Sequence, residues 1–184
     1  MYIVIGASSF IGVYTVDEFI KQGCEVTVTG RNNKFREHYD RLGVPYINLD
    51  LTEKKDFDKL PKEGVDGVIL LAGLLPANAQ VDLNTDENAA DYFEINTIGT
   101  INVLEYCRKN GIKRVISNCS YADVRGAWGK GVITEDEPRD FIYTGDHAVY
   151  VFSKNAANDV LEYYNQQPGM KNAWFRFPPV YGVG

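Results

Sequence analysis

The 184-residue chain has no apolar run close to the roughly 20 residues that a membrane-spanning helix requires. No positively charged segment precedes its first apolar residues, so we expect no signal peptide and a cytoplasmic location. Basic residues are outnumbered by acidic ones, 19 against 25, and no basic cluster occurs. The resulting net charge of -6 argues against a nucleic-acid partner.

Cysteine and histidine are also scarce. The three cysteines, Cys24, Cys107 and Cys119, are odd in number and widely spaced, which predicts a reducing compartment without disulfides or a metal site. The two histidines, His38 and His147, are far apart and show no ligand spacing. These absences leave a soluble globular protein of ordinary composition, with 45% hydrophobic and 24% charged residues.

Short apolar runs rich in β-branched residues recur along the chain. The predicted strands are 2–6, 25–30, 46–50, 67–73, 114–119 and 173–177. Several are apolar at consecutive positions, which indicates strands covered on both faces of a parallel sheet. Helical patterns separate them, and the segments 74–86 and 126–146 read as loops.

Three of the helical patterns are well defined. Apolar residues from Val13 to Ile20 give the first helix one stripe, and Gly23 suits its end. The longest helix is predicted over 87–110 and the last over 149–167. Strands that alternate with helices through short connections predict an α/β fold: one domain over residues 1–184, with a doubly wound parallel sheet of the Rossmann type.

The first predicted strand runs directly into the turn GASSFIG. In a Rossmann unit such glycines allow a tight turn and a close approach of pyrophosphate to a helix N-terminus. Gly6 and Gly12 match, whereas Ser9 stands where a middle glycine is expected, and its hydroxyl can itself contact phosphate. The predicted phosphate-binding residues are Gly6, Ser8, Ser9, Phe10, Ile11 and Gly12. The alternative is a strand–turn–helix junction that binds nothing.

The end of the second predicted strand bears on cofactor selectivity. An NAD-preferring site has Asp or Glu there to hold the ribose 2′-hydroxyl, but this chain has Gly30 and Arg31. Arg31 can pair with a 2′-phosphate, so we expect NADP, with NAD possible; otherwise Arg31 is a solvated loop charge. Asp50, after the third strand, is placed to bind near the adenine, although such a carboxylate is also a common helix cap.

The pair Tyr150 and Lys154 is the main catalytic candidate. Positions i and i+4 share one helix face, so both side chains can reach the cofactor cleft. An ammonium about 4 Å from the phenol, at an effective dielectric near 20, would lower the tyrosine pKa by roughly three units into the working range of a proton shuttle. Ser120, just past the fifth strand, is the predicted hydroxyl donor for the substrate oxygen.

Together, GASSFIG, NLDLTEKKDF, LLAGLL, INTIGTINVLEYCRKNGIKRVIS, YVFSK and FRFPPVYGVG make the chain resemble the extended short-chain dehydrogenase/reductase family, of the NAD(P)-dependent epimerase/dehydratase type. The resemblance implies that Ser120, Tyr150 and Lys154 are the catalytic triad. It implies that Asn96 supports the lysine through the helix and an ordered water. Further cofactor contacts by resemblance are Leu51, Leu71, Ala72, Gly73, Tyr150 and Lys154.

The resemblance also implies a homodimer, formed as a four-helix bundle by helices 87–110 and 149–167. It implies that the substrate-binding lobe of the family follows the last residues of this chain. We therefore expect the chain to bind dinucleotide, to turn over substrate negligibly, and to associate through exposed apolar surface.

Several positions depart from the family pattern. Ile5 and Ser9 replace the usual Thr and middle Gly of the phosphate turn. The segment CSYADVRG has one extra residue, so Ser120 aligns from the strand but Tyr121 aligns from the following glycine. The family's sugar-nucleotide 4,6-dehydratases use an adjacent Asp-Glu pair here, and this chain has Ala122 and Asp123, which argues against dehydration.

The leading functional prediction is an NAD(P)-dependent oxidoreductase or epimerase that acts on a secondary alcohol or ketone, of a nucleotide sugar by preference. In it, Tyr150 exchanges the hydroxyl proton while the nicotinamide exchanges the hydride. One alternative is an NADPH-dependent ketone or 4-keto-sugar reductase. A second is a non-catalytic NAD(P)-sensing module, and a third is a purely structural fragment.

Overall fold

The computed structural model describes residues 1–31, 33–76, 89–140 and 148–183. Its centre is a six-stranded, all-parallel sheet in the order β3-β2-β1-β4-β5-β6. The strands are β1 Tyr2–Ile5, β2 Val26–Gly30, β3 Tyr46–Asn48, β4 Gly67–Leu70, β5 Val115–Ser120 and β6 Ala173–Phe177. All six predicted strands and the doubly wound α/β class are confirmed.

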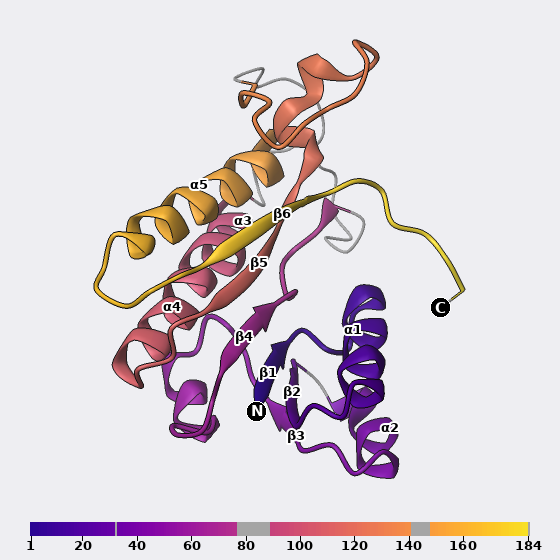
Figure 1. Ribbon diagram of the computed structural model, residues 1–184, viewed down its shortest axis with the longest axis vertical. Coiled ribbons are helices and arrows are strands. Elements are labelled where there is room, and N and C mark those ends of the chain that lie inside the picture. The colour runs from indigo at the N-terminus through magenta and orange to yellow at the C-terminus, as the bar shows by residue number, and fades with distance from the viewer. Residues whose placement is uncertain (32, 77–88, 141–147, 184) are drawn as a thin grey trace.

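Helices cover both faces of the sheet (Figure 1). They are α1 Phe10–Lys21, α2 Arg36–Arg41, α3 Ala89–Tyr92, α4 Gly99–Lys109 and α5 Ala148–Asn165. On one face, α1 and α2 enclose a core that includes Val16 and Tyr39; on the other, α4 and α5 enclose a larger core that includes Leu104 and Leu161. Short 3₁₀ segments lie at Asn33–Phe35, Lys54–Lys59 and Tyr121–Ala127.

The predicted continuous helix over 87–110 is wrong in its middle. Residues 87 and 88 lie outside the described residues, α3 begins at Ala89, and a π-helical segment, Phe93–Ile98, separates α3 from α4. The spacing of the apolar residues does not distinguish an α-helix from a π-helix, because a π turn has only about one residue more than an α turn. The second predicted loop begins two residues too early, because 126–127 end the 3₁₀ segment Tyr121–Ala127; its residues 128–140 agree with the structure. Residues 77–86 and 141–146 of the predicted loops lie outside the described part.

The strand order fixes where a ligand can bind. The chain progresses from β1 outward to β3, then crosses back to β4 on the opposite side of β1. Crevices at the carboxyl ends of such neighbouring strands are the binding sites of doubly wound sheets. Ile5 stands in register with Thr29 on one side and with Leu70 on the other, so the turns after β1, β2 and β4 meet at one edge. No helix in the described part of the chain is long and apolar enough to cross a membrane.

Candidate active site

The turn after β1 is closed by hydrogen bonds of its own. Ser9 is the N-cap of α1: its Oγ accepts from the Gly12 N–H at 3.1 Å and donates to the Gly6 carbonyl at 2.8 Å. The hydroxyl proton of Ser9 is thus used within the turn, whereas the sequence suggested a phosphate contact. The backbone N–H groups of Phe10 and Ile11 remain without intrahelical partners, as at any helix start, and can meet an anion.

At two positions of this turn no residue larger than glycine fits. Gly6 has a φ of 92°, and a Cβ there would lie 2.7 Å from the Cα of Ala72 in the turn after β4. A Cβ at Gly12 would overlap the Gly6 carbonyl and lie 2.8 Å from the Ala7 Cα. The absence of a side chain at Gly6 therefore lets the turns after β1 and β4 come into contact.

A cleft of about 280 Å³ lies over these turns. Of the predicted cofactor residues, those that line it are Gly6, Ser8, Ser9, Arg31, Asp50, Leu51, Leu71, Ala72 and Gly73. The side chains of Phe10 and Ile11 line a different hollow, of about 760 Å³, between α1 and residues 180–182. Only the backbone of these two residues can serve the role predicted from the sequence.

The part of the cleft beside β2 has no acidic side chain at the end of that strand. Arg31 lines the cleft there and is exposed. Asp50 Oδ1 accepts from the N–H and the hydroxyl of Thr52, at 2.9 and 2.8 Å, so this carboxylate organises the turn after β3. Asp50 is not the helix cap suggested as its alternative role, because the N-cap of the next helical segment is Glu53. A cofactor contact of Asp50 remains a prediction.

Tyr150 and Lys154 lie one turn apart on α5 and are 7% and 5% exposed. Ser120 at the end of β5 lies close enough to Tyr150 for its side chain to lower the pKa of the phenol. Lys154 Nζ donates to Asn118 Oδ1 at 3.4 Å. Asn118 and Ser120 are two residues apart on β5, so their side chains point to the same face of the strand, toward α5. The structure brings the three predicted residues together and adds Asn118.

The electrostatics of this pair differ from the prediction. Burial raises the pKa of Tyr150 to about 12, and the side chain of Ser120 opposes that rise without reversing it. Burial also lowers the pKa of Lys154 to about 8, an effect that the nearby Cys119 opposes. The expected lowering of the tyrosine pKa by Lys154 is therefore wrong for the protein alone, because desolvation outweighs the other effects.

Asn96 lies in the π-helical segment and joins two parts of the site. Its Oδ1 accepts from the Leu74 N–H at 2.7 Å, and its Nδ2 donates to the Leu74 carbonyl at 3.1 Å and to Ser153 Oγ at 2.9 Å. Ser153 precedes Lys154 on α5, so Asn96 acts on the lysine helix through its neighbour. The predicted ordered water remains a prediction.

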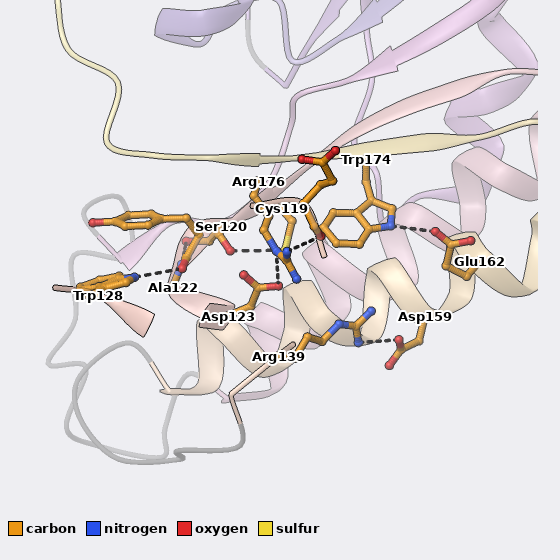
Figure 2. A network of polar contacts seen from close by, with 12 residues as sticks. Cys119, Ser120, Ala122, Asp123, Trp128, Arg139, Asp159, Glu162, Trp174 and Arg176 are labelled. Atoms are coloured by element: carbon orange, nitrogen blue, oxygen red, sulfur yellow. Dashed lines mark hydrogen bonds and ion pairs between the residues drawn. The ribbon is translucent and has the colours of Figure 1, made fainter. Parts of the chain in front are cut away.

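A buried polar network, missed at the sequence level, anchors the turn that follows Ser120 (Figure 2). Asp123 is fully buried, and its Oδ2 accepts from Arg176 Nε of β6 at 3.1 Å. The guanidiniums of Arg176 and Arg139 lie 5.3 and 6.0 Å from the ring centroid of Trp174. Burial raises the pKa of Asp123, and Arg176 opposes this rise. Asp123 is thus engaged within the fold.

Tyr121, the other candidate for the hydroxyl position, has a separate environment. Its ring stacks on Trp128 with centroids 4.5 Å apart, and its carbonyl accepts from the Trp128 indole N–H at 3.3 Å. Figure 2 shows Trp128 and Ser120 at the same end of the network. Of the two candidates, Ser120 is the one whose side chain acts on the pKa of Tyr150.

Comparison with known proteins identifies the family. Residues 2–184 match the NAD dependent epimerase/dehydratase family. The chain belongs to it. A putative UDP-glucose 4-epimerase of Methanocaldococcus jannaschii is 28% identical over 183 residues, 99% of this chain and 56% of that protein. A UDP-glucose 4-epimerase of Pisum sativum is 31% identical over 146 residues, 73% of this chain and 40% of that protein.

Solved structures of the family agree with the fold. The UDP-glucose 4-epimerase of Thermus thermophilus, a complex with NAD, matches with a TM-score of 0.78 and 25% identity, over 95% of this chain and 54% of that one. The chain spans about half the length of the curated epimerases that it matches. A glycine turn beside free helix N–H groups, an open cleft and a buried Tyr–Lys pair fit a dinucleotide of this NAD-dependent family.

Proposed function

We propose that residues 1–184 form the dinucleotide-binding and proton-transfer part of a nucleotide-sugar epimerase that acts on a UDP-hexose. The observation that carries the proposal is the grouping of Tyr150, Ser120 and Lys154, with the Lys154 amine 3.9 Å from the Cβ position of Gly73, a residue that lines the cleft. The names of the relatives supply the UDP-sugar class.

In this proposal each side chain has one task. Ser120 orients the substrate hydroxyl, Tyr150 removes and returns its proton, and the amine of Lys154 holds the cofactor ribose beside Gly73. Bound dinucleotide would supply the hydride acceptor and, in its oxidised form, a positive charge near the phenol. Asn96 holds the segment at Leu74 and the helix of Lys154 in a fixed relative position.

We also propose a preference for NADP. Arg31 lines the cleft, and the end of β2 has no carboxylate to repel a 2′-phosphate. A charge-assisted contact of about 1.5–3 kcal/mol corresponds to roughly 10- to 150-fold preference. The same feature favours the second candidate, an NADPH-dependent ketone or 4-keto-sugar reductase, which would consume NADPH stoichiometrically.

A homodimer is proposed as the assembly, with the 89–109 helical region and α5 of each subunit in the interface. The support is a set of exposed apolar side chains on these elements: Phe93, Ile98 and Tyr163.

The test begins with fluorescence titration of the chain with NADH and NADPH. We expect binding of both, tighter for NADPH, and Arg31→Ala should reduce that difference. Binding of neither cofactor would contradict the proposal, and tighter NADH would contradict the Arg31 assignment.

Turnover is then measured on the chain and on the longest reading frame that contains it, with UDP-galactose as substrate. Where turnover occurs, we expect UDP-glucose without net change of the nicotinamide. Tyr150→Phe should lower the rate by roughly 10²- to 10⁴-fold, the usual contribution of a general acid–base group, while cofactor binding persists. Tyr14→Phe, on the exposed side of α1, is the control.

A further inference from the structure

The amine of Lys154 is held from the side of the sheet by a neutral amide. Its Nζ donates to Asn118 Oδ1 at 3.4 Å. Asn118 lies on β5 two residues before Ser120, so the two side chains point to the same face of the strand. One strand therefore carries both the acceptor for the Lys154 amine and the hydroxyl of the proposed proton-transfer group.

The same amine is next to the cleft. Lys154 Nζ lies 3.9 Å from the Cβ position of Gly73, which lines the cleft. A Cβ at Gly73 would also lie 2.9 Å from Asn96 Oδ1, so the space beside the amine depends on the missing side chain. An ammonium group has three N–H donors and no acceptor. The bond to Asn118 uses one donor and leaves two for further acceptors.

The titratable groups near the amine do not fix it by charge. Among the described residues, Cys119 is the group whose charge acts on the pKa of Lys154, and burial raises the pKa of that thiol. Burial also raises the pKa of Tyr150, one turn away on α5, to about 12. Thiol and phenol are therefore neutral at neutral pH. The Asp123 carboxylate acts on the pKa of Cys119 and not on that of Lys154. The position of the amine thus depends on its bond to Asn118.

We infer that Asn118 is the positioning residue of Lys154: its amide oxygen holds the amine beside Gly73 before a cofactor binds, and leaves the charge of the amine uncompensated. This inference rests on the proposed function, in which Lys154 binds the cofactor ribose. An amide suits the task better than a carboxylate, because a carboxylate would pair with the ammonium and compete with the ribose oxygens. An apolar side chain would leave the buried amine without its acceptor.

The first test needs no cofactor. ¹³C NMR of the lysine side chains gives the pKa of Lys154 in the unaltered chain, in Asn118→Asp and in Asn118→Leu, and Lys154→Met identifies the signal. A carboxylate at this place should raise the pKa by about one to three units. A leucine of similar shape should lower it by about one unit, because the ammonium loses its acceptor. A residue that only fills space would not shift the pKa in opposite directions.

Asn110→Asp and Asn110→Leu are the matched controls. Asn110 donates to the Tyr106 carbonyl at the end of α4, and its replacements should leave the pKa of Lys154 unchanged. An unchanged pKa of Lys154 in either Asn118 variant would overturn the inference, and so would equal shifts in the Asn110 variants.

The second test is a titration with NADH and with NADPH. Asn118→Leu should weaken both by the same factor, about 2- to 12-fold, because the two cofactors share the ribose that Lys154 binds. Arg31→Ala should instead change the difference between them. If the unaltered chain binds a cofactor and Asn118→Leu binds it equally well, the inference is wrong and the proposed function stands. If the unaltered chain binds neither cofactor, the proposed function is wrong and the inference fails with it.

Discussion

The amine of Lys154 is buried, and the groups around it are mainly neutral. Among the described residues, its one hydrogen-bond acceptor is Asn118 Oδ1, at the long distance of 3.4 Å. Burial lowers its pKa from 10.5 to about 8, so the folded chain holds this proton less tightly than the unfolded chain does. A buried charge that is poorly compensated costs stability, which is common at sites kept for function.

We therefore predict that Lys154→Met stabilises the cofactor-free chain at neutral pH. The change in pKa corresponds to about 3 kcal/mol, an order-of-magnitude figure. The sign follows from proton binding: between pH 8 and 10.5 the unfolded state binds more protons, so the unaltered chain gains stability as pH rises. The advantage of the methionine should be complete below about pH 8 and absent above 10.5.

Urea denaturation of both chains at neutral pH and near the upper limit would measure this. The exposed Lys113→Met is the control, and it should change the unfolding free energy by no more than about 0.5 kcal/mol at either pH. Equal stability of Lys154→Met and the unaltered chain at neutral pH would show that the amine is not destabilising.

The sequence predicts the placement of a side chain best where one element determines it. Tyr150 and Lys154 share a face because of helix periodicity alone, and Ser120 follows from its place at a strand end. Asn118 was missed because its contact with Lys154 depends on which helix packs against β5. The pKa of Tyr150 was mispredicted for a similar reason: the spacing indicates the neighbouring charge but not the depth of burial.

At the scale of the element, the π-helical segment Phe93–Ile98 is the feature that the sequence pattern could not indicate. Its apolar residues satisfy an α-helical period well enough to predict one long helix. The structure instead contains a wider turn, and π turns occur frequently at functional sites. Here the turn carries Asn96, whose amide reaches both the Leu74 backbone and Ser153.

Asn96→Ala should loosen the segment after β4. The substitution leaves the Leu74 N–H and carbonyl without their described partner, at a cost of about 1–3 kcal/mol in unfolding free energy. Hydrogen exchange of the Leu74 amide should accelerate by more than the global loss of stability explains. Asn110→Ala, which removes one bond to the Tyr106 carbonyl at the end of α4, should not affect that amide specifically. Unchanged protection of Leu74 in Asn96→Ala would contradict the proposed link.

At the scale of the whole molecule, apolar side chains remain exposed on the two elements proposed for the dimer. Phe93 and Ile98 are 39% and 45% exposed, and Tyr163 on α5 is 59% exposed. A two-fold interface would bury each of them twice, since the same surface of both subunits takes part. Leu42, at the end of α2, is similarly exposed at 46% but lies outside the proposed interface.

Ile98→Glu should therefore dissociate the dimer without unfolding the subunit. It would place two uncompensated carboxylates in the interface, one from each subunit, which should weaken association by roughly 100-fold or more. The side chain is exposed in the single subunit, so the melting temperature measured at low concentration should change little. Sedimentation equilibrium at micromolar concentration would give the masses of the unaltered chain, of Ile98→Glu and of the control Leu42→Glu. A monomeric mass for the unaltered chain, or equal dissociation of both variants, would contradict a dimer through these helices.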